Sequence, residues 1–117
     1  MRVFVCHFGL GPSERQRQAI MLRGILSAAP KPRIALGDFN EWTHGAVANA
    51  LEAELGAISR VKTHPAAWPM LPLDRIYSDM PIEAAYAHWD GVSRVASDHL
   101  PLVAHITTGR AASALPA

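Results

Sequence analysis

The chain has 117 residues, of which 50% are apolar and 18% are charged, and its net charge is +1. This length fits a single domain, and the apolar fraction is sufficient for a core, which argues against a disordered chain. Because the charge is nearly balanced, affinity for a phosphate polymer would depend on a local basic patch. The one cysteine, Cys6, excludes an internal disulfide, and we expect a cytoplasmic protein.

The first half of the sequence alternates between strand and helix patterns. Residues 2–8 are rich in β-branched and aromatic side chains and predict a buried strand. Ser13, with a glutamine three residues later, predicts the N-cap of a helix that stops at the prolines near residue 30. Residues 33–37 predict an inner strand, and residues 46–55 predict a second helix that ends at Gly56. This order predicts a parallel α/β unit.

The second half of the sequence predicts a more antiparallel region. A proline-rich loop at 63–72 precedes strands predicted at 73–78 and 82–89. A last strand is predicted at 100–107, and residues 109–117 are predicted to form a flexible tail.

Polar residues stand at the ends of these strands or interrupt them. Asp38 and Asn40 directly follow a buried strand, two residues apart and therefore on the same side of an extended chain. Asp74 lies within an otherwise apolar strand, where a carboxylate needs a partner. Asp98 and His99 are adjacent, so their side chains point to opposite faces and can serve two different purposes.

These residue types suit the hydrolysis of a phosphate ester. A hard cation such as Mg²⁺ binds carboxylate oxygens and keeps several waters, so Asp98 could be a metal ligand. His99 could take a proton from water while Asp74 orients its ring. Asn40 and His7 could contact the phosphate. Taken singly, each motif also has a structural interpretation, because Asp and Asn are common in turns and a strand histidine is often packed in a core.

The ordered motifs "HFGL", "LGDFN", "LDRI" and "SDHLP" resemble those of the endonuclease/exonuclease/phosphatase superfamily, which includes DNase I-like nucleases, sphingomyelinases and inositol polyphosphate phosphatases. The resemblance runs from Arg2 to Ile106. It implies the carboxy-terminal half of a four-layer α/β sandwich, with residues 1–108 as a partial domain, and Mg²⁺ or Mn²⁺ as cofactor. It implies the following roles: phosphate contact for His7, the catalytic acid and amide for Asp38 and Asn40, histidine orientation for Asp74, a metal ligand for Asp98 (with Asp38), and catalysis for His99.

The resemblance implies hydrolysis of a phosphodiester, by water activated near Asp38 and the Asp74–His99 pair. It does not decide which of these activates the water. Candidate substrates are DNA, a phospholipid head group and a soluble phosphate ester. In the family, a metal-binding glutamate comes from the amino-terminal half, and this sequence has no match for it. The alternative is therefore a truncated, non-catalytic remnant or an interaction module. Half a sandwich leaves an apolar sheet face, so we expect association with a missing amino-terminal half or with a second copy.

Other residues beside the motifs have weaker signals. Arg75 is a candidate phosphate contact, and Trp42 could stack on a substrate. Glu41 is expected to be a solvated loop acid. Where this chain has His64, similar bacterial proteins often have a phenylalanine. The histidines outside the motifs match no zinc-site spacing and are expected at surface or strand positions; they are His44, His64, His88 and His105.

Overall fold

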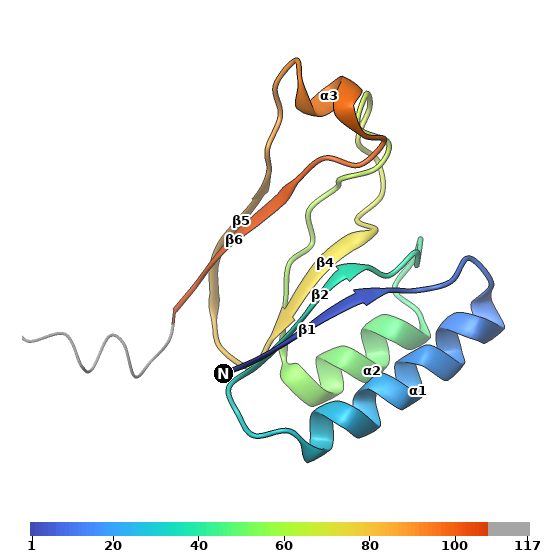
Figure 1. Cartoon of the computed structure of the whole chain (residues 1–117), viewed down its shortest axis with the longest axis vertical. Helices are drawn as coiled ribbons and strands as arrows, with labels where there is room; N and C mark the ends of the chain where they lie inside the picture. Colours follow the sequence, from blue (N-terminus) through green and yellow to red (C-terminus); the bar gives the residue numbers. More distant parts are fainter. Residues whose placement is uncertain (108–117) are drawn as a thin grey trace, which may run out of the picture.

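The computed structural model describes residues 1–107 (Figure 1). The predicted flexible tail, 109–117, lies outside the described residues. The elements in chain order are β1 (Arg2–His7), α1 (Pro12–Ala28), β2 (Arg33–Asp38), α2 (Ala46–Leu55), β3 (Ala57–Ile58), β4 (Asp74–Ser78), β5 (Ile82–Ala87), α3 (Ser93–Ala96) and β6 (Leu102–Ile106). Among residues 1–107, no helix combines the length and the apolar character that crossing a membrane requires.

Within the described residues, the larger sheet has four strands in the order β1-β2-β4-β3. Strands β1 and β2 are parallel, and α1 connects them. This confirms the predicted parallel α/β unit. Strand β4 is antiparallel to β2, and β5 and β6 form a separate antiparallel pair. The second half therefore has the antiparallel character that its sequence indicated.

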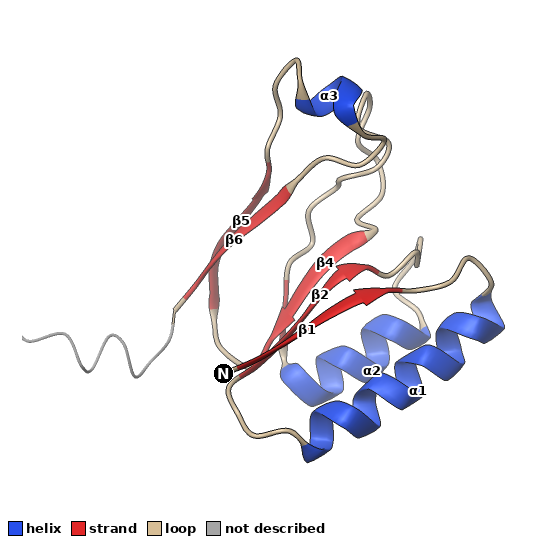
Figure 2. Ribbon diagram, in the orientation of Figure 1, coloured by secondary structure: helices blue, strands red, loops and turns tan. Residues whose placement is uncertain are grey.

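Helices α1 and α2 lie side by side on one face of the larger sheet, as Figure 2 shows. The core fills the space between these helices and the sheet. It includes Leu22 and Leu26 of α1, Leu51 of α2 and Tyr77 of β4. Phe39 is fully buried in this core and packs edge to face against Tyr77, with ring centroids 5.3 Å apart. Because Phe39 faces inward, the polar residues on either side of it are fixed at the sheet end.

The opposite face of the larger sheet is exposed at its β1 edge. Val3 and Val5 are 49% and 79% exposed, although they pair with Ile34 and Leu36 in the neighbouring strand. In Figure 1 the β5–β6 ribbon stands away from β1 on this side. An apolar face left bare in this way is what half of a sandwich predicts.

Both predicted helices form, but one begins earlier than predicted. The N-cap of α1 is Gly11, and Ser13 lies inside the helix, so the predicted Ser13 cap is wrong. The cause is Pro12, whose fixed φ and missing N–H suit the first helical position. Helix α2 ends at Leu55, and Gly56 follows with a φ of 95°, as predicted.

Candidate active site

Three strands place polar side chains in one row at the end of the larger sheet. His7 pairs with Asp38 in the β1–β2 register, and Asp38 pairs with Asp74 in the β2–β4 register. Side chains alternate along a strand, so this row projects from the face opposite the helices, whereas Arg75 projects toward them. The row therefore continues the bare face that Val5 begins.

His99 lies against this row from a separate segment. Its Nδ1 is 2.5 Å from Oδ2 of Asp74, and its Nε2 is 3.6 Å from Oδ2 of Asp38. Partial burial opposes protonation of the ring, but the hydrogen bond with Asp74 and the surrounding carboxylates outweigh it and raise the pKa of His99. The Asp74 bond fixes which ring nitrogen carries the proton in the neutral form and leaves Nε2 directed at Asp38.

The loop at 63–72 holds His99 and Asp74 in position. The buried hydroxyl of Thr63 donates a hydrogen bond of 2.7 Å to Oδ2 of Asp74. Two backbone bonds fix the chain on either side of His99: Ala66 N–H donates to the Asp98 carbonyl (2.7 Å), and Leu100 N–H donates to the Thr63 carbonyl (2.8 Å). His99 therefore reaches the sheet end through tertiary contacts and not through its own strand.

The "GDFN" turn orients Asp38 and Asn40. The backbone N–H of Asn40 donates to Oδ1 of Asp38 (2.9 Å), and its side-chain amide donates to the Phe8 carbonyl (2.6 Å). Asn40 has a φ of 51°, a left-handed conformation that asparagine tolerates. Oδ2 of Asp38 is left facing two imidazoles, since Nε2 of His7 also lies 3.9 Å away.

Gly37 allows this turn to form. Its φ is 140°, and a Cβ at this position would lie 1.9 Å from the carbonyl oxygen of Cys6. The parallel strands therefore approach each other just before Asp38 in a way that only glycine permits.

These residues border an open cleft of about 570 Å³, a volume in the range of small-molecule sites. The lining residues from the predicted site are His7, Asn40, Trp42, Asp98 and His99. His64 and Leu73 from the second half of the chain also line the cleft, as do Glu14 and Gln18 from α1. These five predicted residues thus meet at one cleft, with Trp42 exposed in its wall, whereas Asp38 and Asp74 contact His99 but do not line the cleft.

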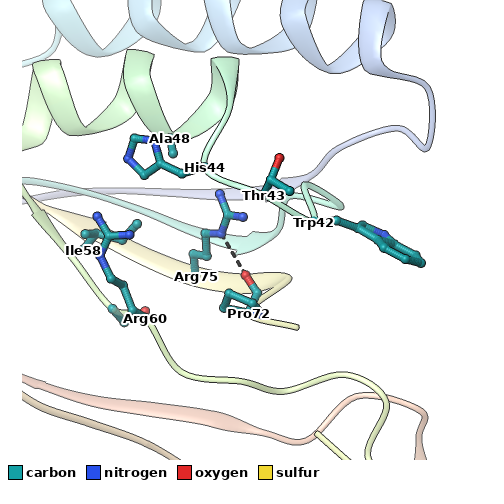
Figure 3. A pocket seen from close by; sticks show the side chains of 9 residues that line it. Trp42, Thr43, His44, Ala48, Ile58, Arg60, Pro72 and Arg75 are labelled. Carbon is teal, nitrogen blue, oxygen red and sulfur yellow. Dashed lines mark hydrogen bonds between the residues drawn. The ribbon is translucent and has the colours of Figure 1, made fainter. Parts of the chain in front are cut away.

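Arg75 is the exception. Its guanidinium is buried, pairs with Oε1 of Glu41 (2.9 Å) and also donates to Oη of Tyr77 and the Pro72 carbonyl. Figure 3 shows Arg75 and its bond to Pro72 beside Thr43, at a smaller pocket. The expectation that Arg75 contacts phosphate is wrong, because strand alternation turns its side chain toward the helices.

Glu41 is also not the solvated loop acid that we expected. Its buried carboxylate accepts hydrogen bonds from the backbone N–H groups of Val47 and Ala48 at the start of α2. Burial opposes ionisation, but the Arg75 bond and the backbone donors outweigh it and lower the pKa of Glu41. The pair joins the "GDFN" turn to α2 and β4, and so has a structural role.

The described residues contain two groups whose ligand atoms could surround one cation: Asp38, Asp74 and His99, and His64, Asp98 and His99. The first group uses its atoms internally, because Asp74 and His99 are bonded to each other. In the second group the Asp98 carboxylate is 79% exposed and available. An exposed carboxylate beside an open cleft fits a divalent cation that keeps part of its water shell.

Sequence reasoning gave Thr63 no role and expected His64 at a surface or strand position. The structure gives His64 a β-bridge with Leu71 and also places it in the wall of the cleft. The "TH" pair at the start of the proline-rich loop is the one signal in the sequence, and its meaning emerges only once the loop folds back on Asp74 and Asp98.

Comparison by sequence identifies relatives of this chain among curated proteins. No family model matches the chain. The alignment of this chain with the uncharacterized protein YbhP of Escherichia coli K12 spans 121 positions at 33% identity. It covers 91% of this chain and 46% of YbhP. YbhP of Shigella flexneri gives the same values. The chain spans about half the length of the curated relatives it matches.

The solved structures that are similar to this chain include the following three. A mannosyl-6-phosphatase of Bacteroides thetaiotaomicron has a TM-score of 0.74 at 16% identity, covering 91% of this chain and 51% of the other. A functionally unknown conserved protein of Enterococcus faecalis gives 0.73 at 18% identity, with 90% and 49% covered. An endonuclease/exonuclease/phosphatase of Bacteroides vulgatus gives 0.66 at 18% identity, with 86% and 47% covered. In each case, half of a larger fold matches nearly all of this chain.

Proposed function

The chain has the carboxy-terminal half of the endonuclease/exonuclease/phosphatase fold, and from this premise we propose that it is a divalent-metal-dependent phosphoesterase whose preferred substrates are phosphodiesters. One observation carries the proposal. His99 lies between Asp74 and Asp38, 2.5 Å from the first and 3.6 Å from the second, at a cleft that Asn40 and His7 also line. This is a hydrogen-bonded acid–histidine pair that faces a second carboxylate.

The roles follow from which atoms are already engaged. Asp74 holds Nδ1 of His99, so Nε2 is the nitrogen that faces Asp38. An attacking water held between Nε2 and Oδ2 of Asp38 would have two groups able to take its proton. Asn40 and His7 border the same space and would contact the phosphoryl oxygens.

The metal would be Mg²⁺ or Mn²⁺, with the exposed Asp98 carboxylate as its first ligand; Asp38, the second expected ligand, lies in the other group and would join it only after the two carboxylates approach each other. When bound, it would neutralise charge on the phosphoryl group. Such cations keep several waters and use phosphate oxygens as ligands, so few protein carboxylates are needed. A further carboxylate from a protein surface that covers the bare face would complete the ligand set.

The substrate class is less constrained. The net charge of +1 gives little support to strong non-specific binding of DNA. A phospholipid head group and a soluble phosphate ester both fit a cleft of about 570 Å³. Phosphatase activity belongs to the Bacteroides thetaiotaomicron neighbour by its name, which supports including monoesters among the substrates.

A substrate panel tests the proposal. The 117-residue chain is assayed with bis(p-nitrophenyl) phosphate, p-nitrophenyl phosphate, duplex DNA and sphingomyelin vesicles, with Mg²⁺ or Mn²⁺ and with EDTA. We expect metal-dependent diester hydrolysis that EDTA abolishes and that His99→Ala reduces by about 100-fold or more. His88→Ala is the control, since His88 is exposed and pairs with Asp90 outside the cleft. Hydrolysis of none of these esters would favour the non-catalytic alternative.

A further inference from the structure

His64 has an unusual environment in the wall of the cleft. Its side chain is only 26% exposed, and its ring lies 4.6 Å from the ring of His99 between centroids. Its Nδ1 is buried and has no hydrogen-bond partner within the described residues. Its Nε2 is directed at Asp98 but is 3.9 Å from Oδ2, beyond hydrogen-bonding distance. A cation beside Asp98 would bind Nε2, which makes no hydrogen bond within the described residues, whereas the buried Nδ1 would stay without a partner.

The spacing of His64 and Asp98 suits a shared cation. Two atoms bound to one tetrahedral Zn²⁺ at about 2.0–2.2 Å each lie about 3.3–3.6 Å apart. The observed 3.9 Å is slightly longer, a gap that the exposed Asp98 side chain can close. The nearest ligand atoms of His64, Asp98 and His99 all lie within 4.8 Å of one another. His99 Nδ1 is engaged by Asp74, whereas no hydrogen bond within residues 1–107 competes for the ring of His64.

We propose that His64 and Asp98 together bind a transition-metal cation, with Mn²⁺ as the representative ion, and that His64 makes this site prefer such an ion to Mg²⁺. Mg²⁺ favours oxygen ligands and gives up its waters reluctantly, so an imidazole adds little to its binding. Imidazole suits Fe²⁺, Ni²⁺, Cu²⁺ and Zn²⁺ best, and Mn²⁺ is the weakest binder of the first-row series, so Mn²⁺ serves as the spectroscopic probe of the site. The inference rests on the proposed function only where it gives the bound metal a catalytic role beside His99. Binding of the metal can be measured without any reaction.

Electron spin echo envelope modulation of bound Mn²⁺ tests the proposal without substrate. A nitrogen nucleus bound to Mn²⁺ modulates the echo, and an all-oxygen site does not. The full chain loaded with Mn²⁺ should show nitrogen modulation, and His64→Phe should remove it. Titration calorimetry should show Mn²⁺ binding weakened by about tenfold or more in His64→Phe, with Mg²⁺ binding changed by less than about twofold. His88→Phe, which removes an imidazole from an exposed His–Asp pair outside the cleft, should change neither.

Two further variants keep the test decisive. Asp98→Asn alters an exposed side chain, so it tests the site even if His64→Phe does not fold; it should weaken Mn²⁺ binding by a similar factor. His99→Ala should retain the nitrogen modulation. Modulation that persists in His64→Phe and disappears in His99→Ala would overturn the proposal, as would Mn²⁺ binding no tighter than Mg²⁺ binding. Nitrogen modulation in a chain that hydrolyses no ester would support the metal site and reject the phosphoesterase, so the two failures can be told apart.

Discussion

Asp38 and Asp74 lie directly opposite each other in the antiparallel β2–β4 pair, and both are oriented toward the ring of His99. Two carboxylates at this position would repel each other without a donor between them. His99 provides that donor, and Thr63 adds a second one to Asp74. The arrangement therefore holds the pair of carboxylates in place, with Asp38 Oδ2 facing Nε2 of His99.

Asp74→Asn should reduce kcat on a diester substrate by about 100-fold or more and leave KM within about threefold. The reason is that the neutral amide no longer fixes the proton on Nδ1 of His99 or stabilises the charged ring, as in other acid–histidine pairs. Steady-state kinetics provide the measurement. Asp90→Asn, in an exposed pair with His88 outside the cleft, is the matched control and should have near-normal kcat. A normal kcat in Asp74→Asn would reject the orienting role.

Gly37→Ala should lower the free energy of unfolding by at least about 2 kcal/mol and reduce activity as well. A Cβ at this position meets the Cys6 carbonyl at 1.9 Å, and the φ of 140° is strained for any other residue. Chemical denaturation measures the effect. The control is Gly24→Ala inside α1, where nothing lies within 4 Å of the added Cβ. It should stabilise the chain by about 0.5–1 kcal/mol. Equal effects at the two positions would contradict the argument.

Glu41→Gln should lower the free energy of unfolding by about 3 kcal/mol at neutral pH, because it leaves the buried Arg75 guanidinium without a counter-charge. The pKa of Glu41 is lowered in the folded chain, so its ionised form stabilises the fold above the ordinary value of 4.5. This contribution is lost as the pH falls through the lowered folded pKa. Denaturation curves should therefore differ fully above about pH 5 and converge at lower pH. Glu83→Gln, on the exposed side of β5, is the control. A gap that stays constant down to low pH would argue against the ion pair.

The bare face at β1 should make the chain associate or bind the dye ANS. Val5 is 79% exposed on that face, and soluble monomers rarely leave a continuous apolar patch open. Val5→Lys should weaken association by about tenfold and reduce dye fluorescence, as sedimentation and fluorescence titration would report. Val95→Lys, an exposed valine on α3, should change neither. A monomer that binds no dye before any substitution would contradict the expectation.

Local sequence was enough to predict most of the fold around the site. The strand that ends at Asp38 and the helix that ends before Gly56 follow from burial patterns and a helix-terminating glycine. Tertiary pairing was harder to predict. Nothing near Arg75 indicated that Glu41 would meet it across 34 positions of sequence. Strand alternation could have excluded Arg75 from the site, since its neighbour Asp74 projects to the opposite face, toward His99.

His64 shows a different limit of sequence reasoning. No spacing rule relates it to Asp98, because the two meet only after the loop at 63–72 folds back on the segment before β6. The backbone bond between Ala66 and Asp98 makes that contact. Ligand patterns read along one chain cannot anticipate sites that are assembled from two loops.

The row formed by His7, Asp38 and Asp74 is the final rung of the same strand ladder whose earlier rungs carry Val3 and Val5. Any protein surface that lies on those valines must end beside His7, at the mouth of the cleft. Such a surface would border the cleft and would limit the size of a molecule that can enter it. Association with another protein surface and the access of molecules to the cleft would then both depend on this edge of the sheet.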